Sequence, residues 1–359
     1  MKLLHMNHRS IKFSLVFLVS GKLLDAKLTN ETQPCQLFRR IKLGLVPGRE
    51  PVLPATHALV TVLSSEAYAP GLSALHSSLK HILTPYLPHV IIVDLDAPPF
   101  SILMRIIRPL EYYVVGLSTV APFLSAVGLE CTSGKRIQQI KSIMAVTAAQ
   151  KRKATYSKLF AWGIGRYVRR GALYVDADAL FMRATTRQDV VTLVASCAKG
   201  SISAVYGRGL VDKPRQAPKD PYYFNSGVFA YHPSRKTLAQ LVSRLVAGKY
   251  APDRSNPTEQ DVLVSHWREN KHAVIPLGPE FNVRPYFNGQ TMPKNTKIVH
   301  WIGFPKPWEV IQAAEGHKIE PNAIANYIKR HNPKSACLRC LPLWSLELYI
   351  DSSGPNLSA

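Results

Sequence analysis

The stretch SKLFAWGIGRYVRRGALYVDADALFMR, residues 157–183, determines how the rest of the chain is organised. Its first part has apolar residues at helical spacing and leads into a basic turn that contains Gly171. The apolar run over 172–175 predicts a short buried strand, and Asp176 and Asp178 follow it directly. Open α/β sheets bind their ligands at the carboxyl ends of the strands. We therefore expect the two carboxylates to hold a divalent cation, which in turn would hold a diphosphate.

The composition is that of a globular protein with a strongly basic surface. The 359 residues, 46% of them hydrophobic, suffice for one large α/β domain or two smaller ones. The formal net charge of +22 favours polyanions such as nucleic acid, acidic membranes or phosphorylated small molecules, unless it only reflects a generally basic surface. We find no arginine-rich arm, zinc-finger spacing or aromatic RNA-binding signature, so nucleic acid is not expected as a partner.

Strand and helix patterns alternate along the chain. Strands are predicted over 57–63, 89–95 and 112–117, with helices near 68–80 and 100–108 between them. This alternation is typical of a parallel sheet with helices on its faces. Further helices are predicted over 130–153, 189–198, 234–247, 259–267 and 321–330, and further strands over 201–206 and 297–300. The fold class we predict is α/β, as one domain with a Rossmann-like, mostly parallel sheet flanked by helices.

The two ends of the chain carry less information. Residues 1–55 are predicted to be a leader and linker, 56–310 the main domain and 311–359 a C-terminal extension. The apolar stretch Phe13–Val19 is too short to span a bilayer and is either the core of a weak signal peptide or a loosely packed leader. A cytoplasmic location is favoured, with the secretory pathway or Golgi as the alternative. Cys337 and Cys340 form a lone CxxC, which is weak evidence for zinc.

A third candidate ligand lies far downstream of the two aspartates. His300 ends the last predicted strand, and two carboxylates with one imidazole suit Mn²⁺ better than Ca²⁺ or Mg²⁺. A single histidine in an apolar run is usually a core residue, so this assignment depends on its neighbours. Gly303 permits close backbone approach, and Lys306 supplies a point charge for phosphate. Pro307 and Trp308 would stiffen the loop that bears this lysine.

Four blocks of sequence resemble the glycogenin-like glycosyltransferases of family 8. In the order of that family they are TVLSSEAYAPGLSALHSSLK (61–80), YSKLFAW with LYVDADAL (156–180), YYFNSGVFAYHPS (222–234) and HWIGFPKPW (300–308). Each block alone is only suggestive, but together and in order they are specific. The resemblance spans about residues 56–310 and implies a nucleotide-binding fold of the GT-A type, with this segment as the catalytic domain.

The resemblance also implies roles for individual residues. Asp176, Asp178 and His300 would ligate Mn²⁺, while Asn225, Glu259 and Gln260 would lie beside the anomeric carbon as the catalytic group. The residues implied for donor binding would line the pocket for the nucleotide, diphosphate and sugar: Val62, Ser64, Tyr68, Lys158, Asp176, Ala177, Asp178, Asn225, Ser226, Gly303 and Lys306.

The chain departs from the glycogenin pattern at three positions. Glu259 stands where glycogenin-type members have Asp, and the resulting Glu-Gln-Asp resembles the galactinol-synthase-like branch. Ser65 replaces an Asn of the base pocket, and Asn256 stands where glycogenins have Asp. The donor hexose and the acceptor therefore stay open.

The function predicted from the sequence is Mn²⁺-dependent transfer of a hexose, glucose or galactose, from a UDP-sugar with retention of configuration. The acceptor would be a glycan, a protein, a polyol or a tyrosine of the enzyme itself, such as Tyr349, and a homodimer is a further option. Two alternatives are a basic protein that binds nucleic acid or membranes, and a transferase fold that binds nucleotide sugar without turnover. Structural roles also remain open for single residues: Lys158 as a surface residue, 225–227 as a turn, and Glu259 as the acidic first turn of a helix.

Overall fold

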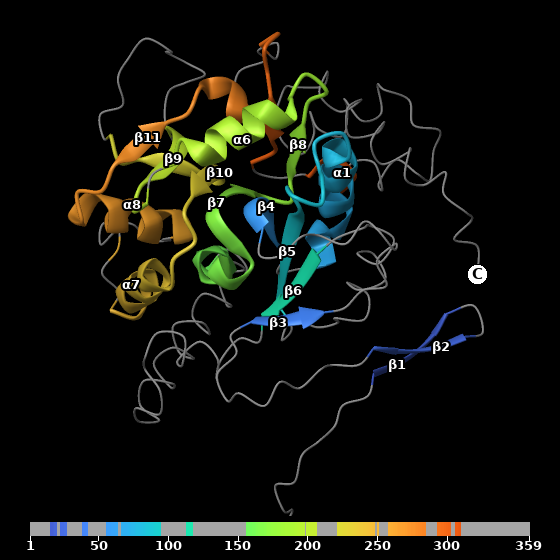
Figure 1. Cartoon of the computed structure of the whole chain (residues 1–359). Helices are drawn as coiled ribbons and strands as arrows, with labels where there is room; N and C mark the ends of the chain where they lie inside the picture. The colour runs from blue at the N-terminus through green and yellow to red at the C-terminus, as the bar shows by residue number, and fades with distance from the viewer. Residues whose placement is uncertain are drawn as a thin grey trace, which may run out of the picture.

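The computed structural model describes residues 15–19, 22–26, 38–41, 55–63, 66–94, 113–117, 156–197, 199–206, 221–247, 250, 258–284, 293–302 and 306–309. Their largest feature is an eight-stranded sheet with strand order β11-β9-β10-β7-β4-β5-β6-β3 (Figure 1). The strands of this sheet are β3 (Phe38–Ile41), β4 (Ala55–Leu63), β5 (His89–Asp94), β6 (Tyr113–Leu117), β7 (Val168–Val175), β9 (Ile202–Tyr206), β10 (Phe224–Tyr231) and β11 (Val274–Pro276).

Two short ladders accompany the large sheet. β1 (Leu15–Val19) pairs with β2 (Lys22–Ala26), and β8 (Ala179–Phe181) pairs with β12 (Ile298–His300), both antiparallel. The helices are α1 (Ala69–Leu79), α6 (Arg187–Ala195), α7 (Arg235–Val246) and α8 (Glu259–Glu269), with 3₁₀ helices η1 (Glu66–Tyr68), η2 (Ser157–Arg166) and η3 (Pro279–Phe281).

The large sheet is mostly parallel, as the alternation of strands and helices predicts. β7, β4, β5 and β6 are parallel neighbours, and β11 is parallel to β9. β10 runs antiparallel to both of its neighbours, β7 and β9, and β3 runs antiparallel to β6. The antiparallel β10 begins beside the end of β7 at which the two aspartates lie and runs away from it, with Val228 opposite Val175 and Tyr231 opposite Ala172.

Both faces of the sheet are buried, which explains the nearly continuous apolar strands. In β4, Val60 and Val62 face one core, whereas Leu59 and Leu63 face the other. The first core is closed by η2, α7 and α8, and the second by α1 and α6, which lie above the sheet in Figure 1. Strands with helices on both sides are typical of parallel sheets.

Side-chain caps lie at the starts of α6, α7 and α8, and at α8 Thr258 N donates to Asp261 Oδ2 at 2.7 Å. Thr186 and Asp189 form a reciprocal capping box, in which Thr186 Oγ1 accepts from Asp189 N at 3.1 Å and Thr186 N donates to Asp189 Oδ2 at 2.7 Å. Ser234 Oγ accepts from Thr237 N at 3.2 Å and begins α7. Such a cap typically contributes about 1 kcal/mol.

The helices predicted over 189–198, 234–247 and 259–267 are confirmed with shifts of a few residues at their ends.

Some local predictions from the sequence were wrong. The strand expected over 172–175 begins at Val168, so the basic segment up to Gly171 lies within β7 and not in a turn. A Cβ at Gly171 would lie 2.7 Å from Val194 Cγ1 on α6, so close packing accounts for the glycine. The helical segment before β7 is a 3₁₀ helix over Ser157–Arg166.

Other predictions lie outside the described residues or stay untested. The helices expected over 100–108, 130–153 and 321–330 lie outside them, as does the extension 311–359. Within residues 1–55, β1 and β2 form a hairpin and β3 adds an edge strand to the large sheet. The domain boundaries at 55 and 310 remain predictions.

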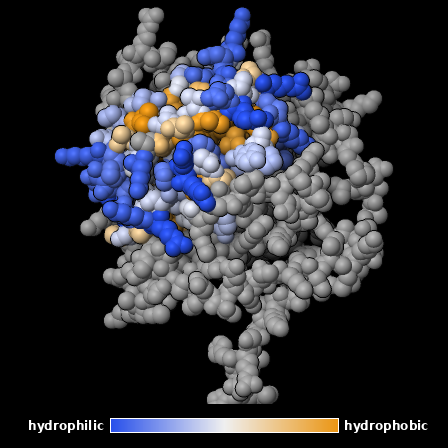
Figure 2. Space-filling view, viewed as in Figure 1, coloured by the Kyte–Doolittle hydropathy of each residue, from blue (hydrophilic) through white to orange (hydrophobic). Residues whose placement is uncertain are grey.

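The described surface is polar at its edges. Figure 2 shows hydrophilic residues gathered around a band of more apolar ones on the face in view. Tyr86, at 72% exposure, is the large hydrophobic side chain most open to solvent in the described part of the chain. Among the residues that the structure describes, we find no helix with the length and apolarity needed to cross a bilayer.

Candidate functional site

The two aspartates lie in a turn between β7 and β8 that is held on both sides. Asp176 N donates to Gly227 O of β10 at 2.8 Å, and Ala179 N donates to Asp176 O at 3.1 Å. On the far side of the turn, Trp301 N donates to Asp178 O at 2.9 Å. The backbone of this turn is therefore fixed by the large sheet and by the residue that follows β12.

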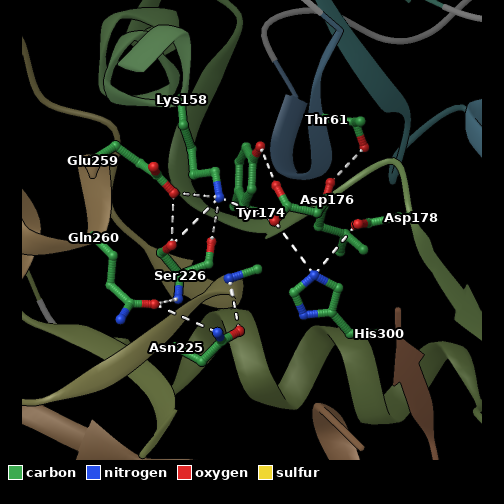
Figure 3. A network of polar contacts seen from close by, with 12 residues as sticks. Thr61, Lys158, Tyr174, Asp176, Asp178, Asn225, Ser226, Glu259, Gln260 and His300 are labelled. Carbon is green, nitrogen blue, oxygen red and sulfur yellow. Dashed lines mark hydrogen bonds and ion pairs between the residues drawn. The ribbon is translucent and has the colours of Figure 1, made fainter. Parts of the chain in front are cut away.

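The β8–β12 ladder brings His300 to the aspartates. In this antiparallel pair His300 lies opposite Ala179, the residue directly after Asp178. His300 Nε2 lies 3.2 Å from Asp178 Oδ1 and 3.5 Å from Asp176 Oδ2 (Figure 3). The three side chains predicted to act together thus converge, although they come from distant parts of the sequence.

The donor set of this triad fits a divalent cation. One atom from each of Asp176, Asp178 and His300 lies within 4.8 Å of the others. Asp178 Oδ1 is buried and accepts no hydrogen bond from the described residues, while His300 Nε2 faces it. Two carboxylate oxygens and one imidazole nitrogen suit Mn²⁺ and related transition metals better than Ca²⁺.

A lysine balances each aspartate. Lys158 of η2 donates to Asp176 Oδ2 at 3.0 Å, and Lys306 forms an ion pair with Asp178 Oδ2. Lys306 Nζ also donates to Trp301 O at 2.7 Å and lies over the ring of Tyr68, 5.4 Å from its centroid. A buried lysine is stable only when it is paired in this way.

The two carboxyl groups differ in their acidity because their surroundings differ. Burial raises the pKa of Asp176, and the nearby Asp178 carboxylate adds to the rise, although Lys158 opposes it. Burial would also raise the pKa of Asp178, but Lys306 outweighs it, so this pKa lies below its usual range. Asp178 is consequently the residue that keeps its negative charge more firmly.

Lys158 joins this cluster to a third acid. Its Nζ lies 2.9 Å from Glu259 Oε1 and donates to Ser226 O at 3.1 Å. Ser226 Oγ also donates to Glu259 Oε1 at 2.9 Å. Burial would lower the pKa of Lys158, but Asp176 and Glu259 outweigh it and raise the pKa above its usual range. Lys158 is 7% exposed, so the alternative that it is a surface residue was wrong. Glu259 does lie in the first turn of α8, as its structural alternative expects, but it is buried and also pairs with Lys158.

Amide side chains form the other half of the site. Ser226 N donates to Gln260 Oε1 at 3.1 Å, and Asn225 Nδ2 lies 3.5 Å from the same oxygen. Gln260 Nε2 donates to Tyr223 OH at 3.1 Å. Residues 225–227 belong to β10, so the alternative that they are simply a turn was wrong.

Of the remaining predicted site residues, the structure describes Val62, Ala177 and Tyr68. Val62 is buried near the end of β4, and Ala177 is buried between the two aspartates. Tyr68 contacts Trp308 edge to face, with ring centroids 5.7 Å apart. Ser64 and Gly303 lie outside the described residues.

Sequence reasoning missed several residues of the site, Tyr174 and Asn282 among them. Tyr174 OH donates to Asp176 Oδ1 at 2.8 Å, and Asn282 Oδ1 lies 3.0 Å from His300 Nδ1. Tyr174 could have been found, because a residue two positions before Asp176 on a strand points to the same side. Asn282 carries no local signal, since it follows η3 in an irregular segment.

Comparison with known proteins identifies the family to which the chain belongs. The model of glycosyl transferase family 8 matches residues 125–312, and the chain belongs to this family. The mostly parallel sheet with helices on both faces agrees with the α/β fold class predicted from the sequence.

The individual proteins that resemble this chain share 30% or less of their aligned residues with it. The chain is 30% identical to glycogenin-1 of Caenorhabditis elegans over 161 residues, which cover 43% of this chain and 32% of that protein. It is 28% identical to glycogenin-1 of Mus musculus over 261 residues, covering 70% of this chain and 65% of the relative. The chain thus spans less than two thirds of the length of either relative. A solved structure of the galactosyltransferase LgtC, with donor and acceptor sugar analogs, matches at 15% identity and a TM-score of 0.46, covering 80% of this chain and 95% of that one.

Proposed function

We propose that this protein is a divalent-metal-dependent hexosyltransferase that takes glucose or galactose from a UDP-sugar with retention of configuration. The observation that carries the proposal is the convergence of Asp176, Asp178 and His300 on one point, with their ligand atoms within 4.8 Å of one another. Lys158 and Lys306 lie directly beside this point, where a diphosphate would need positive charge.

Mn²⁺ is the cofactor we propose, held by Asp176, Asp178 and His300. When bound, it would supply positive charge to stabilise the diphosphate as a leaving group. The other contributions come from the chain itself. Lys306 would turn from Asp178 toward the diphosphate, and Lys158 would hold Asp176 in place. A fixed positive group beside a developing negative charge typically contributes about 3–4 kcal/mol to the rate.

The sugar end of the donor would lie against the second half of the site. Asn225, Glu259 and Gln260 would surround the anomeric carbon, where positive charge develops as the bond to the diphosphate breaks. Glu259 is already paired with Lys158 at 2.9 Å, so its carboxylate is held in one orientation before the donor binds. The proposed donor pocket is completed by Val62, Ser64, Tyr68, Ala177, Ser226 and Gly303.

The test is a UDP-release assay with UDP-glucose and UDP-galactose, in Mn²⁺ and after chelation. We expect Mn²⁺-stimulated UDP release from the wild type and none from Asp176→Ala. Asp189→Asn is the control, because Asp189 caps α6 and pairs with Lys297 but contributes no atom to the triad. Binding of the donor without UDP release in any condition would assign the non-catalytic alternative instead. Undiminished release from Asp176→Ala would contradict the metal site.

A further inference from the structure

A series of hydrogen bonds leads from His300 to the residues of the proposed sugar face. His300 Nδ1 lies 3.0 Å from Asn282 Oδ1, and Asn282 Nδ2 donates to Asn225 Oδ1 at 2.8 Å. Asn225 Nδ2 in turn lies 3.5 Å from Gln260 Oε1. Asn282 is 3% exposed and is the one member of this series that no sequence motif singles out. It connects the two halves of the site.

Two backbone amides determine which atoms of this series donate hydrogen bonds and which accept them. Gly227 N donates to Asn225 Oδ1 at 3.0 Å, and Ser226 N donates to Gln260 Oε1 at 3.1 Å. A backbone N–H can only donate, so the atoms it meets must be the carbonyl oxygens of the two side-chain amides. The oxygen and nitrogen of Asn225 and Gln260 are therefore assigned by the backbone of β10, which is how such amides have to be assigned.

The same reasoning assigns the donor and acceptor atoms of Asn282 and His300. Because Asn225 Oδ1 is an acceptor, the Asn282 atom at 2.8 Å from it must be the NH₂ group. The other Asn282 atom, its carbonyl oxygen, is then the one that faces His300 Nδ1. An oxygen without a proton can only accept, so Nδ1 of His300 must carry the proton. Nε2 is then the ring nitrogen left to coordinate a cation, and it faces Asp176 and Asp178.

We infer that Asn282 is a positioning residue that holds His300 in the Nδ1–H tautomer, with Nε2 free to bind a cation, and that fixes Asn225 through the same amide. The His300 ring is also confined by β10, because a Cβ at Gly227 would lie 1.8 Å from His300 Cε1. Partners in this outer position typically change metal affinity or activity by about 10–100-fold. The inference rests on the proposed metal site, and it adds a link between metal binding and the sugar face.

Two substitutions separate the two roles of Asn282. Asn282→Asp keeps an acceptor for His300 Nδ1–H but has no donor for Asn225. Asn282→Leu loses both. We expect Asn282→Asp to bind Mn²⁺ within about threefold of the wild type yet to release UDP about 10–100-fold more slowly. Asn282→Leu should weaken Mn²⁺ binding about 10–100-fold as well. Mn²⁺ affinity is measured by calorimetry in the absence of donor, with thermal unfolding recorded alongside.

A matched control comes from another asparagine–histidine pair. Asn270 Nδ2 lies 3.2 Å from His266 Nδ1 at the end of α8, away from the triad. Asn270→Leu should leave Mn²⁺ affinity unchanged. Nitrogen NMR of ¹⁵N-histidine-labelled, metal-free wild type gives a second readout, with the His300 signals assigned by their absence in His300→Gln. The expected result is a protonated Nδ1.

The outcomes are distinguishable. Full Mn²⁺ affinity in Asn282→Leu, or a His300 Nδ1 without a proton in the wild type, would overturn the role of Asn282. Absence of any Mn²⁺ binding to the wild type would instead overturn the proposed metal site, while the tautomer would still decide the role of Asn282. If Asn282→Leu does not fold, Asn282→Asp and the wild-type tautomer remain decisive.

Discussion

Lys158 lies between two carboxylates, 3.0 Å from Asp176 and 2.9 Å from Glu259, and its side chain is only 8% exposed. Because these groups are buried, the attraction between the lysine and the acids mainly compensates for the free energy that the charges lose when they leave water. A buried ion pair contributes little over an apolar replacement, but removing one partner leaves an uncompensated charge. The cluster therefore makes the site rigid, and it also makes it sensitive to single substitutions.

Lys158→Met should accordingly lower the free energy of unfolding by about 3–5 kcal/mol, as is usual when one partner of a buried pair is removed. Arg244→Met is the comparison, because its partner Glu269 is 56% exposed, although the Arg244 side chain itself is 13% exposed. Water can solvate Glu269 when Arg244 is removed, so the loss should be smaller than for Lys158→Met. Urea unfolding of both variants measures the difference. Equal destabilisation would show that burial does not govern these pairs, and Lys158→Met with Glu259→Gln should recover part of the loss.

Gly227 is required for space and not for its backbone angles. Within the described residues, positive φ values occur at Lys271 and Gly200. A Cβ at position 227 would lie 1.8 Å from His300 Cε1, so the imidazole would have to leave its place between Asn282 and the aspartates.

Gly227→Ala should therefore abolish the binding of Mn²⁺ and cost about 1–3 kcal/mol of stability through overpacking. Calorimetric titration with Mn²⁺ measures the first effect and urea unfolding the second. Gly165→Ala is the control glycine, because the nearest atom to its Cβ would be Pro233 O at 3.9 Å. Wild-type metal affinity in Gly227→Ala would mean that the ring of His300 is not where binding occurs.

At the scale of elements, a series of buried polar contacts supports the strand that ends in the aspartates. His76 of α1 stacks on His89 of β5, with ring centroids 5.8 Å apart. His89 Nε2 lies 2.9 Å from Thr61 Oγ1 of β4, and Thr61 donates to Val175 O at 2.9 Å. These contacts cross three neighbouring strands and end one residue before Asp176.

Acidification should destabilise the protein through these two histidines. Burial lowers the pKa of His76 to about 2 and that of His89 to about 3, whereas the unfolded chain has values near 6.5. Between these values the unfolded state binds more protons, so stability is complete above about pH 6.5 and falls as the pH drops. Each histidine should contribute about 2 kcal/mol of loss between about pH 7.5 and 5.

The measurement is urea unfolding at both pH values, for the wild type and for the double variant His76→Asn with His89→Gln. The glutamine side chain introduced by His89→Gln retains a donor for Thr61 but does not titrate, so the variant should show a weaker loss of stability on acidification. His266, whose pKa burial lowers to about 4, titrates in both proteins and cancels in the comparison. An identical pH dependence in both proteins would exclude the histidine pair as its source.

Elements with strong periodicity could be predicted from the sequence, and short ones could not. β4, β5 and the helices after β7 carry long apolar patterns and were predicted to within a few residues. β8 is only three residues long, and its pairing with β12 is what places His300 beside Asp178. The proposed ligands of the site could be named from residue type and resemblance, but Asn282 could not, because its side-chain contacts are with residues far along the chain.

At the scale of the whole molecule, the acids of the site stand out from a basic chain. The formal net charge is +22, yet three carboxylates gather with one imidazole at the edge of the sheet. The triad joins β7, β8 and β12, so a cation held by it would cross-link segments that are distant in sequence. A ligand that binds only the folded state stabilises the whole fold by mass action.

Mn²⁺ should therefore raise the melting temperature of the wild type, and a free concentration of about 100 times Kd should add about 2.7 kcal/mol. In a domain of this size that corresponds to a rise on the order of 5 °C. Asp178→Ala removes a ligand and should show no rise, while Asp189→Asn, which changes an acid outside the triad, should keep it. Scanning calorimetry with and without Mn²⁺ measures each case. A rise in Asp178→Ala equal to that of the wild type would place the stabilising ion elsewhere, and the link between β7 and β12 would have to come from protein contacts alone.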